Sequence, residues 1–222
     1  MSIKLIIATT LLIAVRSPAA TQQQGGPKVK KSAHQRKVVE SHENLLIKPG
    51  LSIGVIRVGD SRERVSALFD NGKPESSDCG EMFRKVVDGQ PAGNLTAQVK
   101  DGYVFQIDSG TPRFHTSDGV AAYDRPEKVR AHYKHLRAYA DDLTSMALGD
   151  RPVIYWVDTD RGIAFEFAYF PEEHRRYLYS VIVFRPHGLL CPQGEQVDPS
   201  HWHELLPYSL EPPDRTARLC TE

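Results

Sequence analysis

The sequence predicts an α+β fold: two tandem repeats, each a helix plus an antiparallel meander, which together form a two-layer α/β sandwich. Two observations carry this prediction. A similar phrase occurs twice, as GVIRVGDSRERVSALF at residues 54–69 and as GVAAYDRPEKVRAHY at residues 119–133. Three segments with the composition of β-strands follow each copy. Because a helix on a meander covers one face of a sheet, two such units side by side place both helices on the same face.

The repeated phrase has the pattern of a helix start. In each copy an aspartate, Asp60 or Asp124, stands three residues before a glutamate, which is the spacing of a capping box. Apolar residues then recur at helical spacing, and an Asn-Gly pair followed by a proline ends the first copy. We therefore expect Asp60 and Asp124 to cap helices at about residues 60–70 and 125–140.

Strand-like segments follow each predicted helix. Their middle members alternate apolar and polar residues, as half-buried strands do. Asp101-Gly102, between the last two segments of the first copy, is a strong hairpin signal, whereas the corresponding turn of the second copy is the longer and charged PEEHRRY. The expected strands are residues 82–87, 95–100 and 103–108 in the first repeat, and residues 153–158, 162–170 and 178–184 in the second.

These elements divide the chain into five parts. The segment that precedes the first repeat has no apolar period and carries five basic residues between residues 28 and 37, which indicates a flexible tether. The expected parts are a signal peptide at residues 1–20, a flexible basic leader at 21–46, repeat 1 at 47–112, repeat 2 at 113–188, and an irregular proline-rich tail at 189–222.

The first twenty residues have the pattern of a secretory signal. Lys4 gives a positive start, residues 5–15 are an uncharged apolar run, and small residues before position 20 suit cleavage. The run is too short for a permanent transmembrane helix, and no later segment approaches that length. The sequence therefore predicts a secreted or periplasmic protein with no transmembrane segment.

The charge balance argues against a nucleic-acid partner. The chain has 28 basic and 28 acidic side chains, so its formal net charge is zero, whereas nucleic-acid binders normally carry a basic excess. Hydrophobic residues make up 40% and charged residues 25%, which is ordinary for a soluble globular protein. No residue pattern indicates a cofactor, and none is expected.

Secretion permits a disulfide bond among the three cysteines, Cys79, Cys191 and Cys220. Cys191 and Cys220 bracket the proline-rich tail. A bond between them would close a loop of about thirty residues and contribute roughly 3–4 kcal/mol through chain entropy. We therefore expect the pairing Cys191–Cys220, with Cys79–Cys191 as the competing pairing.

The helix start GDSRERV at residues 59–65, the glycine and proline break after it, and the meander with its Asp-Gly hairpin resemble one family of secreted modules. These are the small outer-membrane-assembly lipoproteins of the SmpA/OmlA type and the tandem modules like β-lactamase inhibitory protein. The resemblance covers residues 51–186 and implies a two-layer α/β tandem repeat in the cell envelope that works through protein–protein contact. No lipidation cysteine follows the signal, so the membrane-anchored role of those lipoproteins does not carry over. No binding residue of the inhibitory protein matches a position here, so the resemblance supplies no site residues.

The predicted role is binding or scaffolding, with another envelope or extracellular protein as the partner. We expect the binding surface at the hairpin tip, residues 171–177. Tyrosine, tryptophan and arginine carry most of the energy of protein interfaces. A turn that is longer in one copy than in the other is also a place where a specific role would arise. An equally simple interpretation is an exposed hairpin whose aromatic residues face the core. The expected binding residues are Trp156, Tyr169, Arg175, Arg176, Tyr177 and Tyr179.

The alternative function is a secreted serine esterase. GDS at residues 59–61, between a strand-like run and a helix, resembles the nucleophile block of the SGNH/GDSL hydrolases, and DPSH at residues 198–201 resembles their Asp-x-x-His block. In that case Ser61 is the nucleophile, His201 the base and Asp198 the carboxylate that orients the base. The blocks that supply oxyanion donors are lacking, and the second copy of the phrase keeps the aspartate but not the serine. A non-enzymatic module is therefore the main prediction.

A metal site is a further, weaker possibility in the tail. His201, His203 and Glu204 are residue types that bind zinc, and two histidines separated by one residue on a strand point to the same side. A further ligand has no obvious source in the sequence. We expect no metal.

Overall fold

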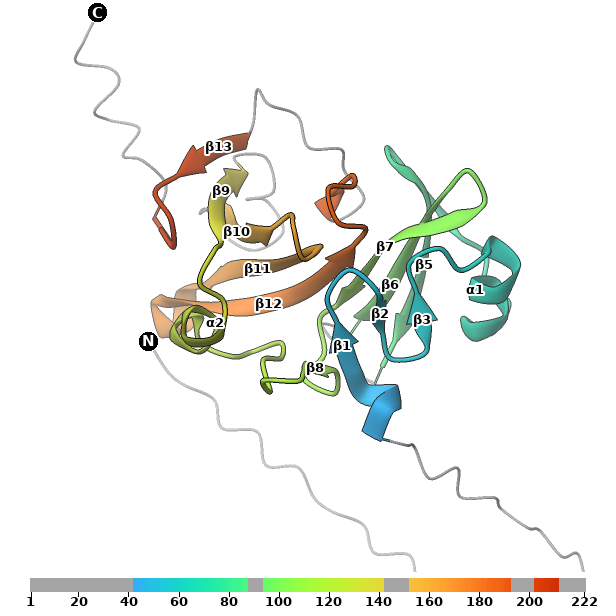
Figure 1. Ribbon diagram of the computed structural model, residues 1–222, viewed down its shortest axis with the longest axis horizontal. Helices are drawn as coiled ribbons and strands as arrows, with labels where there is room; N and C mark the ends of the chain where they lie inside the picture. Colours follow the sequence, from blue (N-terminus) through green and yellow to red (C-terminus); the bar gives the residue numbers. More distant parts are fainter. Residues whose placement is uncertain (1–41, 88–93, 142–151, 193–201, 212–222) are drawn as a thin grey trace, which may run out of the picture. The chain divides into compact units, whose positions relative to one another are not determined.

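The computed structural model describes residues 42–87, 94–141, 152–192 and 202–211 of the chain. The structure is mostly β-sheet, with 48% strand and 14% helix. Its strands form a nine-stranded antiparallel sheet and a smaller four-stranded sheet. Figure 1 shows these strands together with two short helices, α1 (Arg62–Leu68) and α2 (Pro126–His132).

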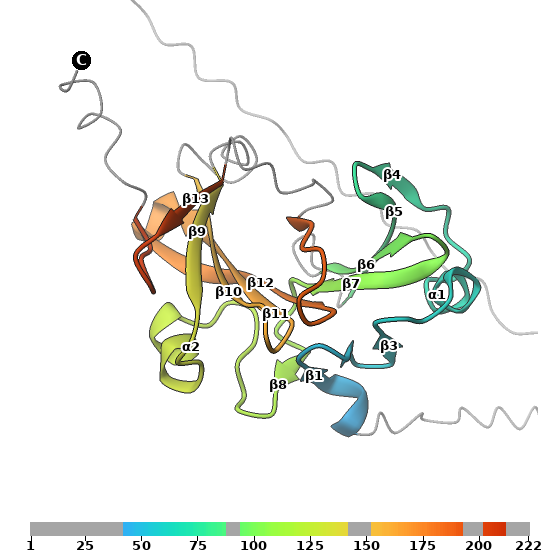
Figure 2. The ribbon, with the colours of Figure 1, turned by 45° about the horizontal axis from the view of Figure 1, so that its top comes forward.

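The nine-stranded sheet has the order β13-β9-β10-β11-β12-β7-β6-β5-β4. One meander runs from β4 to β7 and another from β9 to β12, and the two meet where β12 pairs with β7 (Figure 2). The turn between β11 and β12 contains a short 3-10 helix. The strands are β4 (Glu75–Ser77), β5 (Gly80–Val86), β6 (Asn94–Lys100), β7 (Tyr103–Ser109), β9 (Arg137–Asp141), β10 (Val153–Asp158), β11 (Ile163–Phe170), β12 (Arg175–Phe184) and β13 (Trp202–Leu205).

The six strand segments expected from the sequence are confirmed as β5, β6, β7, β10, β11 and β12. The hairpin at Asp101-Gly102 is also confirmed. Both of its residues have positive φ, +54° and +83°, which the favoured two-residue hairpin turn requires. The sequence pattern succeeded here because these strands are long enough to show their composition, and because the turn at Asp101-Gly102 is well marked.

The four-stranded sheet has the order β3-β2-β1-β8 and was not predicted. Its strands have two or three residues each, too few for alternation to be visible in the sequence. A single 3-10 turn, η1 (His42–Leu45), precedes it. The strands are β1 (Leu46–Lys48), β2 (Ser52–Ile53), β3 (Ile56–Arg57) and β8 (His115–Thr116), and β8 pairs with β1 in parallel.

The predicted fold class, a two-layer α/β sandwich of helix-plus-meander repeats, is wrong. The two α-helices of the described residues have only seven residues each, so they are too short to form a layer over a sheet of nine strands. Each helix instead inserts one fully buried valine, Val65 or Val129, into a core that is made mainly by strands. The chain is therefore a mostly β structure with two sheets.

The second helix is much shorter than predicted. It was expected to run to about residue 140, but it ends at His132, and the next residue, Tyr133, already has extended backbone angles. The last residues of the predicted helix, 137–140, lie in β9 instead, which pairs with β10 on one side and β13 on the other. The apolar spacing after Tyr133 fitted both periods, and pairing in the sheet decided between them.

The predicted caps are also wrong. The N-cap of α1 is Ser61, whose hydroxyl accepts from the Arg64 N–H at 3.3 Å, and the N-cap of α2 is Arg125, whose side chain makes no capping bond.

Asp60 and Asp124 each lie one residue before the N-cap and stabilise the turn that leads into the helix. Each aspartate closes the turn before its helix and pairs with a basic residue four positions later. The contacts are Arg57 N to Asp60 Oδ2 at 2.8 Å, Ala121 N to Asp124 Oδ2 at 2.8 Å, Arg64 Nε to Asp60 Oδ1 at 3.1 Å, and Lys128 Nζ to Asp124 Oδ2 at 2.8 Å.

The residues before the two aspartates attach both helix starts to the large sheet in the same way. Gly59 and Tyr123 have positive φ, +91° and +68°. The N–H of Gly59 donates to Val104 of β7, and the N–H of Tyr123 donates to Leu178 of β12. In each case the strand residue donates back to the carbonyl of the aspartate. The repeated phrase therefore specifies a turn that docks a helix on a strand, rather than a capping box.

The main core lies on one face of the nine-stranded sheet. Its buried side chains come from that sheet, from the four-stranded sheet and from both helices, with Phe83, Trp156, Phe165 and Phe167 among the largest. We call the opposite face of the nine-stranded sheet the outer face. It carries a second, smaller apolar cluster over β10 to β12, centred on Tyr155.

Candidate functional site

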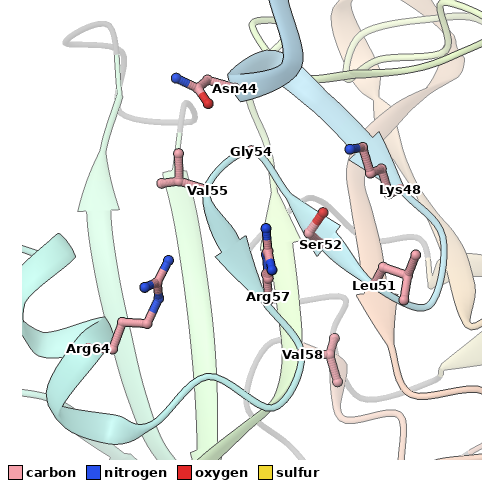
Figure 3. Close-up of a pocket in the computed structure, with 9 residues that line it drawn as sticks. All are labelled: Asn44, Lys48, Leu51, Ser52, Gly54, Val55, Arg57, Val58 and Arg64. Carbon is pink, nitrogen blue, oxygen red and sulfur yellow. The ribbon is translucent and has the colours of Figure 1, made fainter. Parts of the chain in front are cut away.

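A pocket rich in basic side chains lies between the four-stranded sheet and α1. Its volume is about 430 Å³. Figure 3 shows Arg57 of β3 between Arg64 of α1 and Lys48 of β1. We call this cavity the basic pocket; its lining residues are Asn44, Lys48, Leu51, Ser52, Gly54, Val55, Arg57, Val58 and Arg64.

Asp60 holds two of the three cationic residues in place. One carboxylate oxygen accepts the backbone N–H of Arg57, and the other binds Nε of Arg64, at 2.8 and 3.1 Å. The Asp60 N–H also donates to the Arg57 carbonyl at 3.1 Å, which closes the turn between β3 and α1. The turn that docks the helix thus also places both arginines beside the pocket.

The back of the pocket depends on Gly54 at the tip of the hairpin between β2 and β3. Gly54 has a φ of +58°, and a Cβ atom there would lie 2.7 Å from the Asn44 carbonyl oxygen and 2.8 Å from the Phe114 ring. Only glycine tolerates this conformation together with this close approach. The Gly54 N–H donates to the Leu46 carbonyl at 2.9 Å, so the hairpin lies directly against β1.

The pocket carries positive charge that the described residues do not neutralise. No acidic residue lines it. Within the described ranges, the side chains of Lys48 and Arg57 form no ion pair, and Arg64 pairs only through its contact with Asp60. Exposed apolar side chains, Leu51 at 64% and Val55 at 45%, frame the same cavity. The arrangement suits a ligand that is both acidic and partly apolar.

Two of the binding residues predicted from the sequence are not on the surface. Trp156 is 1% exposed and donates its indole N–H to the Ser209 carbonyl at 2.9 Å. Arg176 is 5% exposed and donates to the carbonyls of Pro152 and Phe167. Neither side chain is available to a partner. The sequence could not show this, because successive residues of β10 and β12 face opposite sides of the sheet, and which side is buried depends on how the strands pair and pack.

The other four predicted binding residues are partly or fully accessible. Arg175 is exposed, and Tyr169, Tyr177 and Tyr179 are half-buried. Tyr177 donates to the Glu173 carboxylate, which raises the pKa of the Tyr177 hydroxyl, and its ring packs edge-on against Phe170. The hairpin tip is thus held by contacts within itself, and its role in binding stays a prediction.

The structure describes one of the three residues of the predicted esterase, Ser61. The Ser61 hydroxyl accepts the N–H of Arg64 as a helix cap, which gives this serine a structural role. Asp198 and His201 lie outside the described residues. The esterase alternative therefore gains no support from the geometry.

The disulfide bond joins Cys79 to Cys191, 112 positions apart in the sequence. The expected pairing of Cys191 with Cys220 is therefore wrong, and the competing pairing is the one observed; Cys220 lies outside the described residues. Chain entropy favours the longer loop, and the composition of the tail could not reveal that Cys79 lies beside Cys191. Cys191 is fully buried, and its carbonyl accepts from the side-chain amides of Gln98 and Gln106.

The described residues contain neither a cluster suited to a metal ion nor a helix suited to a membrane. No group of three or more His, Cys, Asp or Glu side chains in the described ranges could hold a metal ion. Of the residues considered for zinc, His203 and Glu204 lie on β13, Glu204 pairs with Arg137 at 2.7 Å, and His201 is not among the described residues. None of the described helices has the length and apolar character to cross a bilayer.

The basic pocket was missed by the sequence analysis. Its three cations are 7 to 16 positions apart and follow no period. The turn at Asp60 brings Arg57 and Arg64 together, and the pairing of β2 with β1 and β3 brings Lys48 beside them. A usable signal was the scarcity of acidic residues between residues 47 and 59.

No protein-family model, curated protein or solved structure matches the chain. The resemblance to the SmpA/OmlA and inhibitory-protein modules therefore stays a prediction.

Proposed function

We propose that the chain is a secreted or periplasmic binding module that holds an acidic segment of a partner protein in the basic pocket. The observation that carries this proposal is the unneutralised charge of Lys48 and Arg57 beside Arg64, in a cavity lined by no acidic residue. In a chain whose net charge is zero, such a local excess of cations is a departure from the average surface.

The exposed apolar side chains of the basic pocket favour a partner segment that is apolar as well as acidic. Leu51 and Val55 expose apolar side chains at the same cavity as the cations. A segment with an apolar residue next to carboxylates would bury these two side chains and pair with the basic groups at the same time. A small inorganic anion would use the cations but leave Leu51 and Val55 exposed.

An envelope or extracellular location is supported by two features. The apolar run at residues 5–15 has the pattern of a signal peptide. The disulfide bond between Cys79 and Cys191 is of the kind that persists in oxidising compartments. The partner would then be another envelope or extracellular protein.

The proposal is tested with labelled peptides and fluorescence anisotropy. The probe is a fluorescein-labelled peptide that alternates glutamate and leucine, and the reference peptide has glutamine in place of glutamate. We expect the acidic peptide to bind the full chain more tightly than the glutamine peptide, and to bind less tightly as salt is added. The double variant Lys48→Gln, Arg57→Gln should weaken binding of the acidic peptide by about tenfold or more.

The control changes the same charge elsewhere. Lys73 and Arg185 are exposed, form no ion pair within the described residues and do not line the basic pocket. The double variant Lys73→Gln, Arg185→Gln should bind like the wild type. Equal loss in both double variants would mean that only net charge matters, and would overturn the proposal. Arg175→Ala with Tyr177→Ala tests the hairpin tip in the same assay.

A further inference from the structure

A second cavity, of about 260 Å³, lies over the middle of the outer face of the nine-stranded sheet. It is remote in sequence from the basic pocket and shares no residue with it. We call it the sheet-centre pocket; it is lined by Met82, Arg84, Asn94, Thr96, Asp108, Gly110, Glu166, Tyr179 and Ser180.

Strand register explains how these polar residues come together. Arg84 of β5 is opposite Thr96 of β6, which is opposite Asp108 of β7. On the other side of the seam between the two meanders, Ser180 of β12 is opposite Glu166 of β11. Five neighbouring strands thus contribute one row of polar groups at a place where a sheet normally carries apolar side chains.

Within this row the Ser180 hydroxyl is a buried group without a hydrogen-bonding partner among the described residues, whereas Asp108 accepts from the side-chain amides of Gln98 and Gln106. Ser180 is 5% exposed, and its hydroxyl oxygen makes no hydrogen bond among the described residues. A buried hydroxyl without a partner is unfavourable unless a ligand or a water molecule satisfies it. Because Ser180 lines the cavity, a molecule inside the sheet-centre pocket is in position to do so.

The other lining residues indicate which hydrogen-bond donors and acceptors a bound molecule needs. Glu166, which is 2% exposed, and Asp108 present carboxyl groups, while Arg84 and Asn94 present donors. Burial raises the pKa of Asp108 to about 7, so its carboxyl group can donate or accept near neutral pH. Burial and the nearby Glu166 raise the pKa of Tyr179, which places a tyrosine beside these carboxyl groups.

We propose that the sheet-centre pocket binds one ring of a neutral sugar. Sugar hydroxyls both donate and accept, so they can donate to Glu166, accept from Arg84 and satisfy Ser180 together. The two carboxyl groups disfavour phosphate or carboxylate ligands, and the polar lining disfavours apolar ones. The cavity is smaller than the sites of drug-sized molecules, which fits a single ring at this point of contact.

The test measures sugar binding to the full chain by saturation-transfer difference NMR at millimolar sugar. The probes are glucose, N-acetylglucosamine and glucosamine. We expect a neutral sugar to receive saturation, and Ser180→Ala and Glu166→Gln each to weaken its binding at least about fivefold, the loss expected when a ligand hydrogen bond is removed. Ser180→Ala removes a hydroxyl that has no partner in the described structure, so the variant should fold normally.

The control is Ser66→Ala, a half-buried serine of α1 outside the sheet-centre pocket, which should leave sugar binding unchanged. Preference for glucosamine over both neutral sugars would overturn the assignment of a neutral sugar. Absence of transfer to all three probes, or transfer that Ser180→Ala and Glu166→Gln leave unchanged, would mean that only water occupies the pocket. None of these variants touches the basic pocket, so peptide binding is an independent measurement.

Discussion

The outer face of the nine-stranded sheet is mainly polar over β5 to β7, where Glu166 and Ser180 continue the polar row onto β11 and β12, and mainly apolar over the rest of β10 to β12. On β5 to β7 it presents Arg84, Thr96, Gln98, Gln106 and Asp108. On β10 to β12 it presents a cluster of apolar residues, Val153, Tyr155, Val157, Ala164, Ile182 and Phe184. Both halves belong to one sheet, and their difference shows two ways of covering the same kind of surface.

The segment after β12 covers both halves with consecutive residues. Leu190 packs on the apolar cluster, while Cys191 lies over the polar half. The Cys191 carbonyl accepts from Gln98 and Gln106 at 2.7 and 2.9 Å, and its N–H donates to Gln106 at 2.7 Å. The apolar half is therefore held by burial, and the polar half by directed hydrogen bonds and a disulfide bond.

The largest effect should come from the covalent contact on the polar half. Replacing Cys79 and Cys191 by alanine opens a loop closed across 112 positions, so the free energy of unfolding should fall by about 4 kcal/mol. Urea denaturation followed by far-UV circular dichroism measures the change. Cys220→Ala is the control and should leave the urea midpoint within error, since Cys220 is not in this bond. Equal loss in both variants would contradict the pairing.

The sequence predicted six long strands of the nine-stranded sheet, but not the short strands or the segments that cover the sheet. The segments that became β5 to β7 and β10 to β12 were long, had strand composition and were bounded by turns, so local pattern was sufficient. The end of α2 was missed because the residues after Tyr133 suit a helix or a strand, and pairing of β9 with β10 and β13 is a long-range effect.

The candidate sites could not be predicted because they depend on register and on one turn. Glu166 and Asp108 are 58 positions apart and approach only through the pairing of β12 with β7 and β11. Arg57 and Arg64 lie close together because Asp60 closes the turn between them. The sequence around Asp60 fits both this turn and a helix cap, so it could not distinguish the two roles. Spacing in the sequence carries neither piece of information.

On the apolar half, Trp202 of β13 packs against the buried cluster. Its ring stacks on Tyr155 with centroids 4.8 Å apart and tilts against Tyr139. Because Trp202 is half-buried, Trp202→Ala should lower the free energy of unfolding by about 2–3 kcal/mol, at or below the lower end for buried aromatic residues. Leu206→Ala, four residues along and 81% exposed, is the control and should cost less than about 0.5 kcal/mol. Similar losses in both variants would argue against this packing.

The polar half should make stability depend on pH. Burial raises the pKa of Asp108 from 3.8 to about 7, so between these values the folded chain binds more protons than the unfolded chain. The stability due to this group is present below pH 4 and is lost as the pH rises to 7. The loss should be on the order of 2 kcal/mol, since Asp108 is partly open to solvent.

Asp108→Asn removes this titration and so should flatten the stability curve between pH 4 and 7. Thermal or urea unfolding at several pH values in one buffer system measures the slope. The variant should be more stable than the wild type at pH 8 and closest to it, or less stable, at pH 4. An unchanged slope would show that another group titrates in this range.

The smallest effect should distinguish two glutamines that both donate to the Cys191 carbonyl. Gln106 bonds both the N–H and the carbonyl of Cys191, whereas Gln98 bonds only the carbonyl and leaves its own buried Oε1 without a partner in the described residues. Gln106→Met should therefore lower the free energy of unfolding by about 1–2 kcal/mol, because the Cys191 N–H is left unpaired. Gln98→Met removes an unpaired oxygen and a long, 3.4 Å bond to Asp108, and it leaves the Cys191 carbonyl bonded to Gln106, so it should cost less than about 1 kcal/mol. Urea midpoints at pH 8 compare the two variants, and the reverse order would mean that Gln98 holds the segment instead.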